Sequence, residues 1–255
     1  MQKKRISIQI AFVIFMLSIW QFCVKLKVYP EAIFPSIGQI FDAFIRLLKE
    51  DALLSKAGNS LLSIVFSVGI SFIFAFILVF LSKRFVAMEA IIGLLAAVAS
   101  PLPGIAILPI VILWIGLNQT AMYFVMIHAM IWPIYTILFA SVLKLDQRYS
   151  RLMTTFRMCI STRLIHVYLQ GALPDIIGAL EVAWGRGWRA LISVEMIFGI
   201  AGRSAGLGWL IYERRMYMDT AGMLAGLAVV AACGALLEGS FRKLKHLGVY
   251  YEDID

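Results

Sequence analysis

The stretch that decides the fold is KLDQRYSRLMTTFRMCISTRLIHVYLQGALP, residues 144–174, the longest polar interruption in an otherwise apolar chain. Basic residues dominate it, and Asp146 is its only acid. Its apolar residues recur at the spacing of one helix face, at Leu152, Phe156 and Ile160. A Ser-Thr pair then interrupts the run and predicts the start of a second short helix. We therefore expect two short amphipathic helices lying against a membrane face, with an ordinary solvated basic loop as the alternative.

The composition of the whole chain favours the membrane interpretation. The 255 residues are 62% hydrophobic and 15% charged, whereas a soluble domain is about 45–50% apolar and about 25% charged. The formal net charge of +8 could indicate a nucleic-acid partner, but no basic face stands apart from the hydrophobic segments. We therefore expect a lipid bilayer and no nucleic acid as partner. Lys and Arg are more frequent in the segments predicted to be cytoplasmic, which predicts both termini inside.

The hydrophobic segments predict an all-α membrane protein with about six transmembrane helices. Residues 1–56 hold a first span, too long an apolar run for a signal peptide, and then an amphipathic helix on the outer face. Residues 57–240 form the core, with residues 144–174 as its cytoplasmic loop, and residues 241–255 are a cytoplasmic tail. The spans expected within the core are 57–82, 86–117, 121–143, 175–198 and 220–240, and a Gly-rich outer segment, 199–219, precedes the last.

Two of these spans contain residues that are unusual inside a membrane. The third span carries Pro101, Pro103 and Pro109, which predict a bend that either serves packing or lines a pathway. The fifth span carries Glu181, Arg186, Arg189 and Glu195, and ionisable residues in a span face the bundle interior or water. They could form structural ion pairs between helices or lie on a pathway. His128 in the fourth span could be a packed or interface histidine, or a ligand or proton relay on the pathway.

Common catalytic motifs are missing from the sequence. There is no G-x-x-x-x-G-K-[ST] phosphate loop, no H-E-x-x-H and no G-x-S-x-G. Three cysteines at wide spacing and three histidines give no metal-binding pattern. We therefore expect no enzyme activity, no cofactor and no metal in this chain, but a conduit that takes its energy from elsewhere.

Three segments together resemble the permeases of ABC importers of the nitrate, taurine and aliphatic-sulfonate group. SPLPGIAILPIVILWIG, residues 100–116, is similar to the family's proline-rich segment, which ends in L-W-x-G. SVEMIFGIAGRSAGLGWLI, residues 193–211, resembles its A-E-M-x-G … G-L-G-Y-L-I segment, and PSIGQIFDAF, residues 35–44, its P-S-P-x-x-V entry. The similarity covers roughly residues 30–240 in the same order and spacing.

The family's signature is a cytoplasmic E-A-A-x-x-x-G loop followed by L-P, which docks into the ATP-hydrolysing subunit. Counted back from Leu173-Pro174, the E-A-A positions fall on Arg151, Leu152 and Met153, and the glycine falls on Arg157. The position, length and amphipathic form of the loop match the family, and its diagnostic residues do not. This departure leaves two arrangements open, a pair of identical permeases or a heterodimer whose partner carries the standard loop.

The resemblance implies the MetI-like permease fold and a multi-pass protein of the bacterial inner membrane. The expected partners are two ABC ATPase subunits, a second permease subunit and an extracytoplasmic solute-binding protein. The solute would be a small organic or inorganic anion, such as a sulfonate, taurine or nitrate, or a small heterocycle. Two other functions stay open at this point, a membrane scaffold without transport and a self-contained channel or secondary transporter.

Two groups of site residues follow from these interpretations. The residues expected to couple to the ATPase are Arg151, Leu152, Met153, Phe156, Arg157, Cys159 and Ile160. The candidates for the translocation pathway are Pro101, Pro103, Pro109, His128, Trp184, Arg186, Trp188, Arg189 and Glu195.

Overall fold

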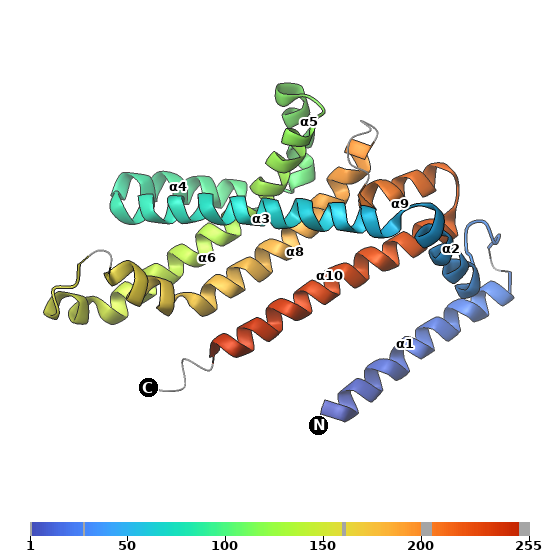
Figure 1. Cartoon of the computed structure of the whole chain (residues 1–255), viewed down its shortest axis with the longest axis horizontal. Coiled ribbons are helices and arrows are strands. Elements are labelled where there is room, and N and C mark those ends of the chain that lie inside the picture. The colour runs from blue at the N-terminus through green and yellow to red at the C-terminus, as the bar shows by residue number, and fades with distance from the viewer. Residues whose placement is uncertain (1, 28, 160–161, 200–205, 250–255) are drawn as a thin grey trace.

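The computed structural model describes residues 2–27, 29–159, 162–199 and 206–249, and every regular element in this part of the chain is helical. In order these are α1 (Gln2–Lys25), α2 (Ile37–Glu50), α3 (Leu53–Arg84), α4 (Val86–Ala99), α5 (Gly104–Ile115), α6 (Gln119–Thr155), the π-helical η1 (Arg163–Leu169), α8 (Leu173–Phe198), α9 (Leu207–Met216) and α10 (Thr220–Val249). They form an elongated bundle (Figure 1). We call the end that carries the tip of α6 and η1 the loop end, and the opposite end the far end.

The predicted all-α membrane fold is confirmed, but the predicted number of spans is not. Four helices, α1, α3, α6 and α10, are long and apolar enough to cross a membrane, and the pair α4 and α5 would make a fifth. The 26 residues of α8 are long enough for a span at 1.5 Å per residue. α8 is not among the apolar helices, because Glu181, Arg186, Arg189 and Glu195 lie within it. By length and composition the structure therefore has fewer spans than the six or so predicted.

The single kinked span predicted over residues 86–117 is instead broken into two helices. α4 and α5 meet at an angle of 106°. Pro103 has no backbone N–H and takes an extended conformation (φ −61°, ψ 130°), so the first helix cannot continue through it. α5 begins at Gly104, where a Cβ would lie 3.2 Å from Val125 Cγ1, so the turn packs tightly on α6. Pro109 lies inside α5 without ending it.

The core of the bundle lies where α6 packs against α8 and α3. Met122, Met126 and Met130 of α6 are fully buried. Gly187 of α8 faces Met130 so closely that a Cβ would approach the sulfur to 2.3 Å. Flexible methionine side chains fill the irregular spaces between helices that small residues allow to approach.

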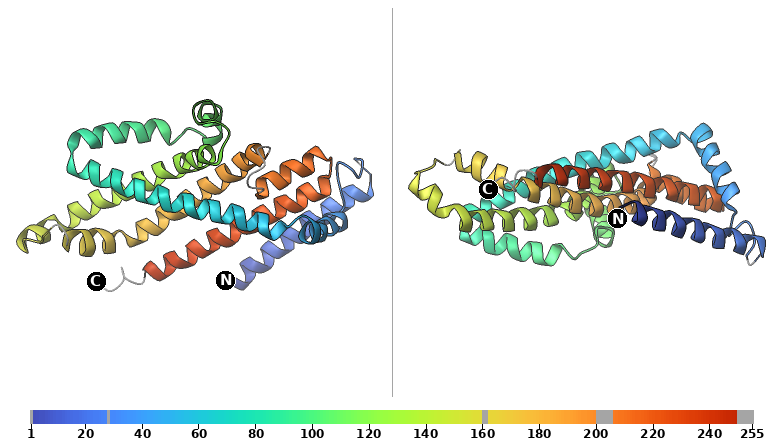
Figure 2. Two further views of the ribbon diagram at one scale, coloured as in Figure 1. Left: turned by 45° about the horizontal axis from the view of Figure 1, so that its top comes forward. Right: turned by 90° about the horizontal axis from the view of Figure 1, so that it is seen from below.

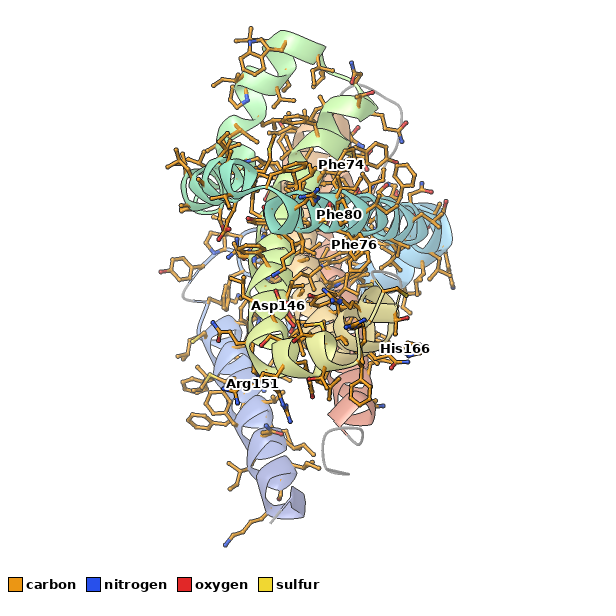
Figure 3. All side chains as sticks on the ribbon, turned by 90° about the vertical axis from the view of Figure 1, so that its left-hand side faces the viewer. Phe74, Phe76, Phe80, Asp146, Arg151 and His166 are labelled. Atoms are coloured by element: carbon orange, nitrogen blue, oxygen red, sulfur yellow. The ribbon has the colours of Figure 1, made fainter. Side chains whose placement is uncertain are left out.

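α3 presents two different faces. Its buried face consists mostly of small residues, among them Ser67, Ser71 and Ala75. The rest of its surface carries large exposed aromatic side chains, with Phe74 52%, Phe76 49% and Phe80 50% exposed (Figure 3). Exposed apolar side chains of this size are expected where a helix faces lipid.

Within the described residues, α1 contacts other parts of the chain near its end. Trp20 stacks on Phe34 with ring centroids 4.1 Å apart, and its Nε1 donates to the Pro35 carbonyl at 3.0 Å. No residue in the hydrophobic window of α1 is buried by the described chain. Figures 1 and 2 show α1 leaving the bundle from the far end, so lipid or another subunit must cover it.

Three local predictions have different outcomes. The predicted amphipathic helix is present as α2, capped by Ser36 and Gln39 in a capping box, and its place on the outer face stays a prediction. The prediction of a first short helix in residues 144–174 is wrong, because α6 continues without a break to Thr155. The second predicted helix is present as the π-helical η1. The segment 199–219, predicted as a Gly-rich outer segment, contains α9, and its outer location stays a prediction. Residues 200–205 lie outside the described part.

Candidate functional site

The tip of α6 ends in a turn that fixes the position of the candidate coupling residues. Arg157 takes the left-handed conformation (φ 46°) directly after the helix. The N–H of Arg157 donates to the Thr154 carbonyl, and that of Met158 to the Met153 carbonyl, both at 3.1 Å. This pair of bonds is the Schellman motif, whose left-handed residue is usually glycine. Arg157 therefore occupies the conformation for which the glycine of the E-A-A-x-x-x-G pattern is suited.

The candidate coupling residues divide into an exposed set and a buried one. Phe156 is 69% exposed and Leu152 is 43% exposed, one turn apart on the same face. Met153 is 5% exposed and holds the tip against the bundle. Arg151, Arg157 and Cys159 are also exposed, and Cys159 contacts the Thr162 hydroxyl. Ile160 lies outside the described residues.

Asp146 joins this tip to the membrane helices. Its carboxylate forms an ion pair with Lys83 at the end of α3 and accepts a hydrogen bond from the Tyr168 hydroxyl of η1. Burial raises the pKa of the Tyr168 phenol, and the Arg163 charge lowers it to a smaller extent, so Tyr168 keeps its proton as the donor. A second contact joins Ser141 Oγ to Asp175 Oδ2 at 2.6 Å, between α6 and α8. Figure 3 views this end of the molecule, with Asp146 and Arg151 on α6 and His166 on η1.

A pocket of about 430 Å³ lies where α4 breaks into α5, against α6 and α8. It brings together five of the nine pathway candidates, which come from three separate segments of the sequence. These five lining residues are Pro101, Pro103, His128, Arg186 and Arg189. Arg186 Nη1 donates to the Ser100 carbonyl at 3.3 Å and to Ser100 Oγ at 3.1 Å. The broken helix therefore both forms the wall of the pocket and orients one of its arginines.

The other four pathway candidates do not line this pocket. Trp184 and Trp188 are buried in the core and stack on each other, with ring centroids 6.4 Å apart. They pack toward α10, since Trp184 contacts Phe241 and Trp188 lies beside Gly234. Pro109 is one turn further along α5. The fourth, Glu195, has a different environment.

Glu195 is a buried carboxylate that caps another helix. It accepts hydrogen bonds from Ser60 Oγ, at 2.7 and 2.9 Å to its two oxygens, and from the Gly208 N–H at 2.9 Å. Ser60 Oγ in turn accepts the Leu207 N–H at 2.9 Å. Both backbone donors belong to the first turn of α9, which has no cap from its own N-cap residue, Gly206. A carboxylate near a helix N-terminus is stabilised by the free N–H groups and the helix dipole.

The glycines around Glu195 are required by space. A Cβ on Gly206 would lie 2.1 Å from Glu195 Oε1, and one on Gly208 would lie 2.3 Å from the Ile192 carbonyl oxygen. This explains physically why an acid and a G-L-G occur together at residues 195 and 206–208. The sequence did not identify Ser60 as a functional residue, because nothing distinguishes it from the other serines of the same apolar span.

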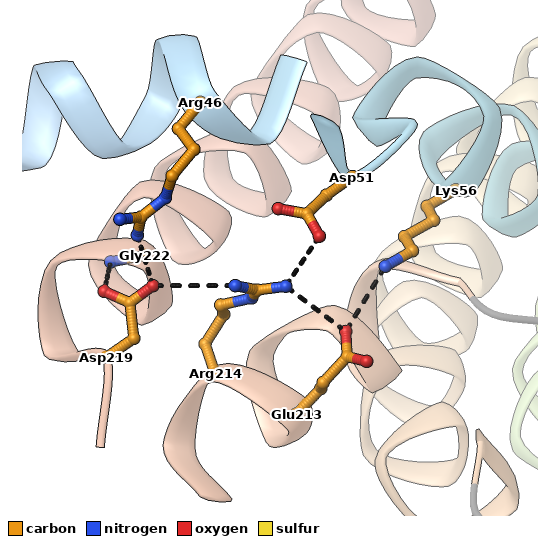
Figure 4. Close-up of polar contacts among 7 residues, drawn as sticks. All are labelled: Arg46, Asp51, Lys56, Glu213, Arg214, Asp219 and Gly222. Carbon is orange, nitrogen blue, oxygen red and sulfur yellow. Dashed lines mark hydrogen bonds and ion pairs between the residues drawn. The ribbon is translucent and has the colours of Figure 1, made fainter. Parts of the chain in front are cut away.

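The far end is held together by a network of charges between four segments (Figure 4). Arg214 of α9 contacts Asp51 at 2.7 Å and, more loosely, Asp219 at 3.7 Å. Asp219 also pairs with Arg46 of α2, and Glu213 pairs with Lys56 of α3. α9 is therefore fixed at its start by buried hydrogen bonds and at its end by ion pairs. Within the described residues, no cluster of three His, Cys, Asp or Glu side chains could hold a metal ion.

Comparison with known proteins identifies relatives of this chain. It is 30% identical over 145 residues to the taurine transport system permease protein TauC of Escherichia coli, which covers 57% of this chain and 51% of that protein. It is 30% identical over 135 residues to the bicarbonate transport system permease protein CmpB of Synechococcus elongatus, covering 52% and 47%. A probable ABC transporter permease protein of Haemophilus influenzae is 24% identical over 91% of this chain and 92% of its own length.

The match to TauC and CmpB spans about half the length of each. The family profile described as "binding-protein-dependent transport system inner membrane component" matches residues 83–245. That range begins at the last turn of α3 and includes the broken pair, the loop end, Glu195 with the start of α9, and most of α10, but not Ser60. The chain belongs to the family of binding-protein-dependent transport system inner membrane components.

Proposed function

We propose that this chain is the permease subunit of an ATP-driven importer, and that a separate ATPase docks on the exposed face of Leu152 and Phe156. The observation that carries the proposal is the continuity of α6, which runs for 37 residues from the far side of the pocket to the loop tip. A helix without a break transmits a displacement along its length. Its exposed apolar residues sit at the i, i+4 spacing of helix-in-groove docking.

The contacts at the loop end support a role in transmission. The ion pair and the hydrogen bond of Asp146 join α6 to α3 and to η1, so force on the tip would reach two helices of the bundle. The hydrogen bond between Ser141 and Asp175 extends this connection to α8, which carries the pocket arginines. Movement of the loop would therefore change the shape of the pocket, as alternating access requires.

The complete importer would contain two ATPase subunits, a second permease subunit and an extracytoplasmic binding protein. In this arrangement the loop end is cytoplasmic, both termini face the cytoplasm and the far end faces the binding protein. The uncovered length of α1 supports contact with lipid or the second permease. The solute path runs along the pocket of α5, α6 and α8, and the named relatives transport taurine and bicarbonate.

The substitution Phe156→Asp tests the docking face. We expect it to abolish solute uptake and solute-stimulated ATP hydrolysis while the protein still inserts into the membrane, because a charge replaces an apolar side chain that is 69% exposed. Phe156→Leu keeps the apolar contact and should retain both activities. Normal stimulated ATPase activity in Phe156→Asp would contradict the proposal.

A further inference from the structure

We propose that the pocket at the break between α4 and α5 is an oxyanion-binding site within the permease, formed by Arg186, Arg189 and the first turn of α5. By this proposal the permease itself selects solutes by charge, in addition to any selection by a binding protein. The inference rests on the proposed function, because it takes the pocket to lie on the solute path.

The first argument concerns unbalanced charge. Among the described residues no Asp or Glu lies within ion-pair distance of Arg186 or Arg189, and none lines the pocket. Glu238 of α10 comes near Arg189 across Gly185 without pairing with it. Glu195, on the same helix, is committed to capping α9. An unpaired arginine is costly inside a membrane, so this face of α8 must meet water or an anion rather than lipid.

The second argument concerns the direction of the backbone donors. α5 has no side-chain cap at its start, and its first residues, Gly104 and Ile105, line the pocket. The free N–H groups of a helix N-terminus favour an anion, and here they lie opposite the two arginines. The P-L-P-G sequence thus has a physical role, because the helix breaks there with a bend of 106° and the start of α5 lines one pocket with residues of α8.

The third argument concerns a polar atom without a partner. His128 Nδ1 is buried and has no hydrogen-bond partner in the described part of the chain. His128 lines the same pocket as the arginines. A buried polar atom left unsatisfied is unfavourable, and a ligand group or a water in the pocket would satisfy it.

These features define the chemistry of the occupant. The volume of about 430 Å³ suits a small molecule. Guanidinium groups bind planar or tetrahedral oxyanions through paired N–H donors, whereas a neutral molecule of the same shape accepts hydrogen bonds from them but forms no ion pair. We therefore assign the site to a small oxyanion, such as a sulfonate or a carboxylate. A lipid phosphate shares this chemistry, so the experiment must distinguish the two sources.

The test uses the whole membrane complex, purified through a tag on this chain and placed in phosphatidylcholine nanodiscs. Titration calorimetry would measure binding of methanesulfonate and of its neutral isostere, dimethyl sulfone. We expect binding of methanesulfonate only. Arg186→Gln and Arg189→Gln should each weaken it on the order of tenfold or more, through loss of a charge-assisted bond. Arg215→Gln, an exposed arginine at the far end, is the matched control and should bind normally.

Each other outcome has a definite meaning. Equal binding of dimethyl sulfone, or normal binding in Arg189→Gln, would overturn the oxyanion site. If anionic phosphatidylglycerol, added to the complex in detergent, binds in an arginine-dependent manner and methanesulfonate does not, the site belongs to a lipid and the solute assignment is wrong. If methanesulfonate binds as expected but no ATPase is present in the complex, the oxyanion site stands and the proposed function fails.

Discussion

Removal of the Ser60 hydroxyl is the sharpest test of the cap that holds α9. In Ser60→Ala the Leu207 N–H loses the acceptor that it has in the described part of the chain, and the Glu195 carboxylate loses the hydroxyl that bonds both its oxygens. A buried unsatisfied donor costs about 1–3 kcal/mol, and a lost hydrogen bond to a charged group about 1.5–3 kcal/mol. Because these terms overlap, we expect a total loss of about 2–4 kcal/mol, or roughly 5–15 °C in the unfolding midpoint.

The assay is thermal unfolding of the purified protein in detergent, followed by the loss of the folded peak in size-exclusion chromatography. Ser240→Ala is the matched control, because Ser240 is exposed and bonds only to the Leu236 carbonyl of its own helix. It should unfold within a degree or two of wild type. A Ser60→Ala midpoint equal to that of Ser240→Ala would refute the reasoning, since it would mean that α9 does not depend on this cap.

Three further predictions follow from the same geometry. Arg157→Gly should stabilise the loop tip by about 1 kcal/mol, because glycine adopts the left-handed conformation without strain. Proteolysis of the tip should then be slower than in wild type. Faster proteolysis would argue against the Schellman turn. Gly208→Ala should sharply reduce the yield of folded protein, because its Cβ would meet the Ile192 carbonyl, whereas Gly239→Ala has open space and should express normally. Tyr168→Phe should weaken coupling between ATP hydrolysis and uptake by removing the donor to Asp146. Since burial raises the Tyr168 pKa, the stability that this bond contributes is complete below the unfolded value of about 10 and is lost as pH rises through the folded pKa. The difference in unfolding midpoint between wild type and Tyr168→Phe should therefore be constant between about pH 7 and 9, and a difference that shrinks in this range would contradict the assignment.

Periodicity and composition were enough to predict the amphipathic helix and the long apolar helices. The amphipathic helix appears as α2, and the hydrophobic runs appear as α1, α3, α6 and α10. Continuity was harder to predict. Polar residues after Val142 suggested a new short helix, but basic side chains do not end a helix in water, and α6 continues to Thr155. Conversely, hydropathy alone did not show that Pro101 and Pro103 would break a span by 106°.

Long-range partners could not be predicted from spacing. From the sequence, Arg186 and Glu195 lie on one charged helix and are both candidates for the translocation pathway. The structure separates them, because Arg186 faces the pocket and Glu195 caps α9 through Ser60, 135 residues earlier in the chain. The glycines at 206 and 208 were the only local signal of this contact, since they mark a place where backbone approaches a side chain closely.

The most direct test of the central claim is photo-crosslinking from position 156 in native membranes. The photoreactive benzoylphenylalanine would replace Phe156 at the loop tip and, as a control, Phe41, which is 62% exposed on α2 at the far end. Mass spectrometry would identify the crosslinked protein. Our account predicts a P-loop ATPase attached at position 156 and none at position 41. An ATPase attached at position 41, or position 156 reacting only with lipid, would show that the loop tip is not where nucleotide hydrolysis acts on this chain.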